Sequence, residues 1–155
     1  MTLHNDILFA AVLEQLAQGN RAILSGTGTS MEPTIHADTD ELVLQSPDKL
    51  QPGQICLYRR PGGGYAIHRI HRLTADSVTL VGDNQVKTET VKPAAILAQV
   101  VTIQRGDTQI DAAAAEFLAQ GYRANKKRLG QFHRRQIRYN MVNFPRRILK
   151  KLLKK

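Results

Sequence analysis

One serine in this sequence lies in a setting suited to nucleophilic chemistry. Ser30 follows Gly26 and Gly28 in the stretch Gly-Thr-Gly-Thr-Ser-Met-Glu-Pro, and Pro33 follows it. Glycine allows unusual backbone angles, and proline fixes φ and prevents a long helix. A serine in such a turn can direct its hydroxyl and its own backbone N–H to one point. That arrangement serves a nucleophile beside an oxyanion site, although a plain polar loop has a similar composition.

A serine hydroxyl needs a base to take its proton, and histidine is the first candidate. His68 and His71 lie in the run Tyr65–Leu73, directly after a glycine-rich turn at 61–64. In a regular strand, residues three apart point to opposite faces, so only one of the two can face Ser30. The remaining histidines, which we expect to be structural or exposed, are His4, His36 and His133.

Four short motifs occur in a fixed order along the first two thirds of the chain. They are Ser30-Met31-Glu32-Pro33, Gly53-Gln54-Ile55-Cys56, His68-Arg69-Ile70 and Gly82-Asp83-Asn84. Their order and spacing resemble the signal peptidase family of serine peptidases, closest to the branch that pairs its serine with a histidine. The resemblance covers roughly residues 24–105. It implies an all-β catalytic core and a preference for small residues just before the cleaved bond.

The resemblance also implies a role for individual residues. Ser30 corresponds to the nucleophile and His68 to the base, and we assign Met31 and Pro33, in the serine motif, to substrate binding. No lysine lies near residues 65–73, which disfavours the serine–lysine pair of related enzymes.

A third group usually orients the imidazole and stabilises its cation. Two acids are candidates here. Asp83 lies in the Gly-Asp-Asn motif, and Glu89 is the acid remaining where the family has a second acidic site. Asp83 keeps the family's neighbouring residues, so we expect it to matter more for activity than Glu89.

The oxyanion site should use the Ser30 backbone N–H. Many members of the family add a serine hydroxyl two residues before the nucleophile, and that position is Gly28 here. Thr27 or Thr29 is the available replacement.

The elements that must position these residues are short. Strand and turn signals predict a small curled antiparallel sheet or barrel, mainly β with flanking helices, in the α+β class. The predicted strands are 21–24, 41–45, 54–58, 65–73, 77–81 and 95–104. We divide the chain into an N-terminal helix (1–20), packed on the body or a remnant of an anchor, a β-rich peptidase-like core (21–110) and a helical basic extension (111–155).

The charge of the chain is concentrated at one end. Residues 1–120 hold nine basic and thirteen acidic residues, whereas 121–155 hold thirteen basic residues and no acid. Pro145 should break the helix, after which aliphatic residues alternate with lysines at helical spacing. We expect residues 130–155 to contact an anionic membrane surface; nucleic acid is less favoured, and a solvated tail is the remaining reading.

Other features bound the chemistry and location. The single cysteine, Cys56, gives no disulfide or metal cluster, and we expect neither a metal nor a cofactor. No apolar run reaches the length of a transmembrane helix, and the N-terminus lacks a basic leader region. We therefore expect a cytoplasmic chain, peripheral on the cytoplasmic face of the membrane, without the family's usual transmembrane anchor.

Together these features predict a serine endopeptidase that cleaves a leader or signal-like peptide. The alternative is a catalytically degenerate peptidase-fold binding protein, whose basic tail docks on membrane, acidic peptide or nucleic acid.

Overall fold

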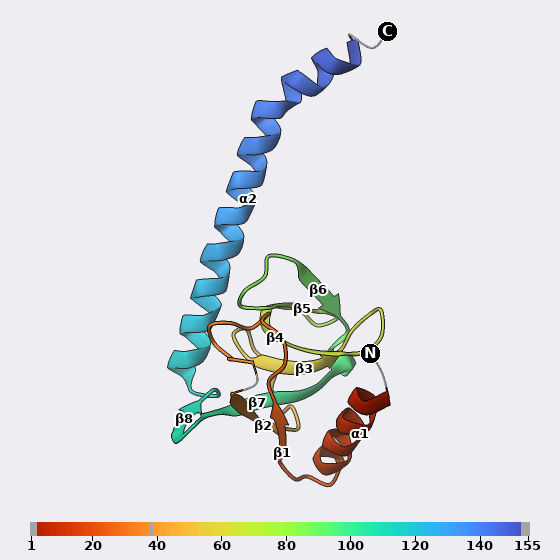
Figure 1. The fold of residues 1–155 in the computed structure, drawn as a ribbon, viewed down its shortest axis with the longest axis vertical. Helices are drawn as coiled ribbons and strands as arrows, with labels where there is room; N and C mark the ends of the chain where they lie inside the picture. The colour runs from red at the N-terminus through yellow and green to blue at the C-terminus, as the bar shows by residue number, and fades with distance from the viewer. Residues whose placement is uncertain (1–2, 38, 153–155) are drawn as a thin grey trace.

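The computed structural model describes the backbone of residues 3–37 and 39–152, and the side chains of residues 8–37 and 39–139. Two helices flank a sheet of short strands (Figure 1), which confirms the predicted α+β class. The elements are α1 (Leu3–Ala17), β1 (Ala22–Ser25), β2 (Asp40–Gln45), β3 (Ile55–Arg59), β4 (Tyr65–Leu73), β5 (Val78–Val81), β6 (Thr88–Val91), a 3-10 turn η1 (Pro93–Ala95), β7 (Ile96–Arg105), β8 (Thr108–Asp111) and α2 (Ala115–Leu152).

All strand pairs in the sheet are antiparallel, and the order is β1-β2-β7-β3-β4-β5-β6 with β8 paired to β7. Because β1 and β6 end the order without pairing to each other, the sheet is curled but not closed into a barrel. Irregularities in register fall at 43/44, 57/58 and 70/72. Such bulges bend strands and raise the local twist, which curls this sheet.

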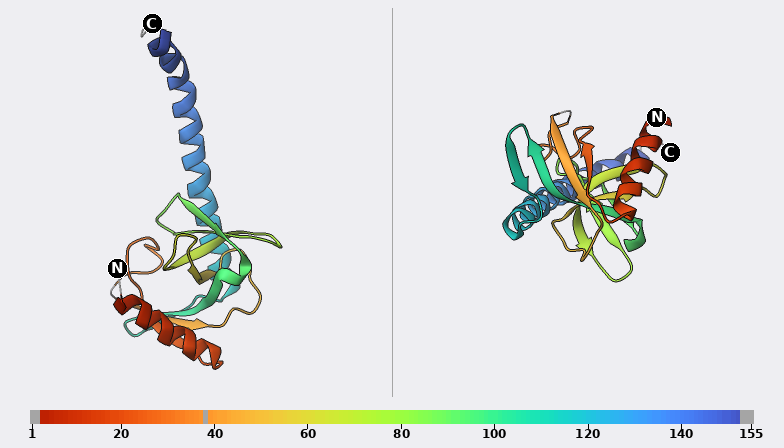
Figure 2. Two further views of the ribbon diagram at one scale, coloured as in Figure 1. Left: turned by 90° about the vertical axis from the view of Figure 1, so that its right-hand side faces the viewer. Right: turned by 90° about the horizontal axis from the view of Figure 1, so that it is seen from below.

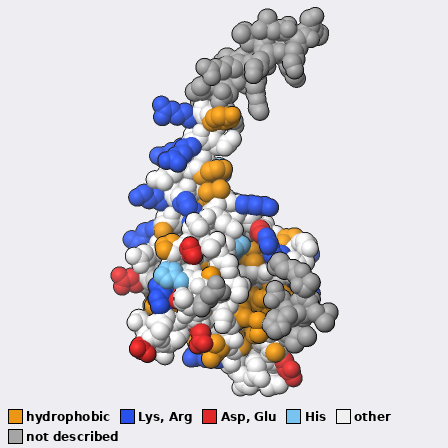
Figure 3. Space-filling model, viewed as in Figure 1, with side chains coloured by type: hydrophobic (Ala, Val, Ile, Leu, Met, Phe, Trp, Pro, Cys, Tyr) orange, Lys and Arg blue, Asp and Glu red, His pale blue; other side chains and the backbone are white. Residues whose placement is uncertain are grey.

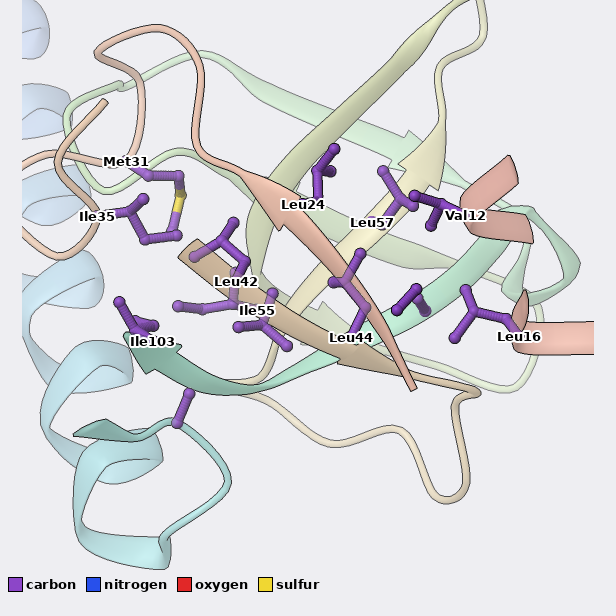
Figure 4. Close-up of a cluster of buried hydrophobic side chains, with 14 residues drawn as sticks. Val12, Leu16, Leu24, Met31, Ile35, Leu42, Leu44, Ile55, Leu57 and Ile103 are labelled. Atoms are coloured by element: carbon purple, nitrogen blue, oxygen red, sulfur yellow. The ribbon is translucent and has the colours of Figure 1, made fainter. Parts of the chain in front are cut away.

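The main core lies between α1 and one face of the curled sheet (Figure 4). Val12 of α1 points at Leu57 of β3, Leu16 points into the same cluster toward Leu44 of β2, and all four are buried. The N-terminal helix is therefore packed on the body. A second cluster lies under β5 and contains Tyr58, Ile70, Val78 and Leu80, among others.

The basic extension predicted for residues 111–155 has two parts. The Asp111 side chain accepts hydrogen bonds from two backbone N–H groups, those of Ala113 and Ala114, and α2 then begins at Ala115. The first part of α2 packs on the body, where Leu118 and Leu129 are buried. Residues 130–139 are all exposed, and the helix leaves the body as a single rod (Figures 1 and 2).

The expected break at Pro145 is wrong, because α2 continues through it to Leu152. A proline removes one intrahelical hydrogen bond and clashes with the preceding turn, which a long helix can absorb as a kink. The predicted aliphatic face of residues 148–153 falls outside the described side chains. Among the described residues, no helix is both long and apolar enough to cross a membrane.

Arg69 of β4 joins α2 to the sheet. Its side chain is 1% exposed, and its Nη1 donates to the Gly53 carbonyl at 2.6 Å. The guanidinium lies 5.3 Å from the centre of the Phe117 ring, and α2 passes over it at Gly121. A Cβ at Gly121 would lie 2.7 Å from Nε and closer still to Cζ and Nη1. The glycine therefore allows the helix to approach a buried cation.

We expect Gly121→Ala to destabilise the fold, although alanine is the better helix former. The Arg69 side chain is held on several sides, so the overlap should cost about 1–3 kcal/mol. The matched control is Gly130→Ala in the same helix, where an added Cβ meets nothing within 4 Å. That variant should gain up to about 1 kcal/mol. Urea unfolding measures both; equal effects of the two substitutions would contradict the packing of α2 on Arg69.

Candidate active site

The Gly-Asp-Asn motif holds the serine turn in place. The Asn84 backbone N–H donates to the Ser30 carbonyl at 2.8 Å, and its side-chain amide donates to the Thr29 carbonyl at 3.2 Å. A Cβ at Gly82 would lie 2.5 Å from the Ser30 carbonyl oxygen. Only glycine therefore allows the two loops to approach this closely.

The Asp83 carboxylate is fully engaged by groups other than His68. Arg69 donates to it twice, from Nε at 2.9 Å and from Nη2 at 2.7 Å. Thr34 donates its hydroxyl at 2.5 Å and Asn125 of α2 its amide at 2.9 Å. The carboxylate therefore joins the serine turn, β4 and α2 at one buried point.

The expectation that Asp83 orients His68 does not match these contacts. Among the described residues, no hydrogen bond joins the two side chains. The reason is the alternation of side chains along a strand. His68 and Arg69 are neighbours in β4 and point to opposite faces, and Asp83 lies on the Arg69 side.

His68 lies at the buried end of a chain of hydrogen bonds that leads to Glu89. The imidazole is 4% exposed, and its Nδ1 lies 2.9 Å from the Tyr58 hydroxyl. That hydroxyl donates to Glu89 Oε2 at 3.1 Å. A phenol has one proton, so the hydroxyl that donates to Glu89 must accept from His68. Nδ1 then carries the hydrogen, and Nε2 keeps its lone pair.

An ion pair with Arg60 holds Glu89, the last residue in this series of hydrogen bonds. Arg60 Nε donates to Glu89 Oε2 at 3.0 Å, and Arg60 Nη2 contacts Oε1. Partial burial raises the pKa of Glu89, but the hydrogen bonds from Arg60 and Tyr58 outweigh it and hold the pKa below its ordinary value. Glu89 is therefore an anion at neutral pH. Burial and the Glu89 charge raise the pKa of Tyr58, so the phenol stays protonated.

The pKa of His68 is lowered, chiefly by burial. The Arg60 charge lowers it further, whereas Glu89 and Asp83 oppose the shift. A histidine normally titrates near pH 6.5, so this imidazole is neutral at pH 7. A neutral imidazole with a free Nε2 is the form that can accept a proton.

Ser30 and His68 line the same cleft, which has a volume of about 550 Å³. In the part of the chain that the structure describes, no hydrogen bond joins the Ser30 hydroxyl to His68, and none uses the Ser30 backbone N–H. The cleft is otherwise mainly apolar, with contributions from α1, β1, β2 and β4. Its remaining walls include Leu8, Phe9, Leu24, Thr27, Gly28, Met31, Ile35, Leu42, Tyr65, Ala66, Ile67 and Gln85.

Some of the other predicted site residues line the cleft and some do not. Met31 lines the cleft and is buried, whereas Pro33 is exposed and does not line it. Of the two threonines beside the serine, Thr27 lines the cleft and Thr29 does not. Thr27 is therefore the better placed of the two to supply a second oxyanion donor.

His71 lies away from the cleft, against α2. Its ring stacks on Tyr122 with the ring centres 6.1 Å apart. Its Nδ1 is buried without a hydrogen-bond partner among the described residues. Burial, helped by Lys126 and Arg128, lowers its pKa.

Sequence reasoning missed Tyr58, Arg60 and the structural role of Arg69. The hairpin offered a signal for Tyr58. The turn at 61–64 pairs Cys56 with His68 across β3 and β4, so Tyr58, two residues along, shares the His68 face. Counting back from the glycines would have placed a phenol beside the base.

Comparison with known families gives one result. The family described as Peptidase S24-like matches residues 4–101, which is well over half of the chain. No match was found among curated proteins or among solved structures.

The contacts of Asp83 and Glu89 predict that replacing each carboxylate by an amide will change the stability of the fold by different amounts. Asp83→Asn should destabilise the fold by about 3 kcal/mol or more, because it leaves the buried Arg69 charge without its anion. Glu89→Gln should cost less, about 1 kcal/mol, because its Arg60 partner is 44% exposed and the amide can keep the hydrogen bond to Tyr58. Chemical denaturation of both variants measures this. If Glu89→Gln were the more destabilised, the structural role would belong to Glu89.

Proposed function

The chain belongs to the Peptidase S24-like family, and we propose that it is a serine endopeptidase that cleaves a leader or signal-like peptide. Ser30 is the nucleophile and His68 the general base. One observation carries this proposal. Ser30 and His68 line one cleft, and the hydrogen bond to Tyr58 leaves His68 Nε2 as the free nitrogen.

The reaction needs only these groups and water. The Ser30 hydroxyl oxygen attacks the peptide carbonyl carbon as its proton passes to His68 Nε2. When the tetrahedral intermediate collapses, the carbon–nitrogen bond breaks and His68 returns the proton to the departing amine. A water then attacks the acyl ester and loses a proton to His68. When this second intermediate collapses, the bond between the carbonyl carbon and the Ser30 oxygen breaks, and His68 returns the proton to that oxygen, which releases the acid product and restores both groups. Because His68 starts neutral, both proton transfers run at neutral pH.

We assign the orienting role to Glu89, acting through Tyr58. The imidazole gains a positive charge when it accepts the serine proton. The Tyr58 hydroxyl fixes the ring through Nδ1, and the Glu89 charge favours the cation, which is the direction of its effect on the His68 pKa. Asp83 is instead a positioning residue, since its contacts hold the serine turn.

The oxyanion of the intermediate needs donors beside Ser30. The Ser30 backbone N–H is the first, and the Thr27 hydroxyl is our candidate for the second. The substrate would lie extended along the cleft, with an apolar side chain near Met31 and Leu42 and a small residue just before the cleaved bond, as the family resemblance implies.

The competing function is a peptidase-like fold that binds peptides without cleaving them. Gly28 favours it, because that position lacks the side-chain donor that many members of the signal peptidase family use. Reactivity of the serine separates the two functions, because binding alone does not require a competent nucleophile.

We expect Ser30→Ala and His68→Ala each to lower kcat by about a thousandfold or more, because nucleophile and base act as one unit. His71→Ala is the matched control and should keep most activity, since that ring lies against α2. Cleavage of a pool of synthetic leader-like peptides, followed by mass spectrometry, measures all three. A dead His71→Ala beside an active His68→Ala would overturn the base assignment.

The pH profile tests the role of Glu89. In the parent chain, kcat/KM should rise with pH through a midpoint below about 6.5, as neutral His68 forms. Glu89→Gln should move that midpoint lower still, because it removes a charge that raises the His68 pKa.

The plateau of kcat in Glu89→Gln should fall by about tenfold to a hundredfold, as expected for losing the charge that stabilises the imidazolium through Tyr58. Tyr58→Phe should lower kcat similarly while leaving KM little changed. An unchanged pH midpoint in Glu89→Gln would remove Glu89 from the catalytic apparatus.

A further inference from the structure

The exposed length of α2 carries a one-sided array of cations. The sequence places seven basic residues and no acid between 123 and 139. Four of them, Arg123, Lys127, Arg134 and Arg138, are spaced by four, seven and four residues, which puts them on one helix face. We call these four residues the cationic face. With a rise of 1.5 Å per residue, it extends over about 22 Å.

This face points away from the body. Leu118, Asn125 and Leu129 are the α2 residues buried against the sheet, and they lie on the opposite side of the helix from the cationic face. Figure 3 shows Lys and Arg side chains mainly along one side of the helix and hydrophobic ones along the other. All four cationic residues are exposed, so a flat surface can reach them together.

The charge restricts what can cover this face. Pairing this face with the same face of a second copy would bring like charges together, since the segment contains no acid to pair with them. An anionic surface is the complementary partner. The two sources with dense phosphate are a lipid bilayer and a nucleic acid.

Two observations favour the bilayer. The aromatic rings that could stack on bases, Tyr122, Phe132 and Tyr139, lie off the cationic face by their helical positions. The sequence after this segment, Arg-Arg-Ile-Leu-Lys-Lys-Leu-Leu-Lys-Lys, sets aliphatic residues among the lysines, a composition typical of segments that bind at membrane surfaces.

We propose that the cationic face of α2 docks the protein on a bilayer that contains anionic lipid. The attraction is electrostatic and acts within a Debye length, about 10 Å at 0.1 M salt. This docking surface is separate from the cleft and independent of the proposed peptidase activity. It gives the enzyme a surface on which membrane-bound substrates would be concentrated.

The test is co-sedimentation of the full chain with vesicles. Vesicles of phosphatidylcholine and phosphatidylglycerol in equal amounts should bind it at low salt and release most of it at high salt. Vesicles of phosphatidylcholine alone should bind little. Equal binding to both kinds of vesicle would overturn the proposal.

Matched variants locate the face. Lys127→Gln/Arg134→Gln/Arg138→Gln should weaken binding by about a hundredfold, because each cation near an anionic surface contributes substantially. Lys49→Gln/Lys87→Gln/Lys92→Gln removes the same charge from exposed positions on the body and should change binding little. Phe132→Ser tests the side of the helix away from the cationic face and should also bind normally. Equal losses in the two charge variants would contradict a specific face.

Two further measurements distinguish membrane docking from nucleic-acid binding and from the peptidase activity. Short duplex DNA at the same phosphate concentration should compete poorly with the vesicles, and preferential binding to DNA would assign the face to nucleic acid instead. Cleavage of a short soluble peptide should be unchanged in the helix variant, so the docking surface and the peptidase can fail independently. A loss of that cleavage would make the helix part of the active site and overturn the separation.

Discussion

The buried ion pair between Arg69 and Asp83 is the interaction on which the rest of the structure depends. Both partners are almost completely removed from water, and each makes further hydrogen bonds that compensate for the lost solvation. A buried pair of this kind is costly to assemble and more costly to break, because removing one partner leaves the other as an isolated charge. Through Thr34 and Asn125, the pair links the serine turn to the long helix.

His68 and Arg69, which are neighbours in β4, have different roles. Side chains alternate in a strand, so the two adjacent residues of one motif serve opposite faces. His68 points to the cleft and meets the phenol of Tyr58, whereas Arg69 points to the other face and anchors α2. The same strand thus aims the base and holds the loop that presents Ser30. A shift of β4 would therefore disturb nucleophile and base together.

Much of this fold could be predicted from sequence because its signals are local. Glycine and proline mark the turns, and period-two patterns mark the strands, so the mainly β core and both helices were recovered. Individual contacts depend on register, which the motifs alone do not give. Asp83 was favoured over Glu89 because it lies in the Gly-Asp-Asn motif. The motif does not show which face of β4 its carboxylate contacts. The bulges that curl the sheet were equally hidden, and so was the helix that continues through Pro145.

The central claim is that Ser30 is a nucleophile activated by His68. The most direct measurement is labelling of the intact chain with a serine-directed fluorophosphonate, with the modified residue identified by peptide mass spectrometry. We predict labelling at Ser30 alone, at a rate that falls sharply in His68→Ala and little in His71→Ala. An unlabelled chain, or a Ser30 labelled equally fast without His68, would contradict the claim and favour a peptide-binding protein.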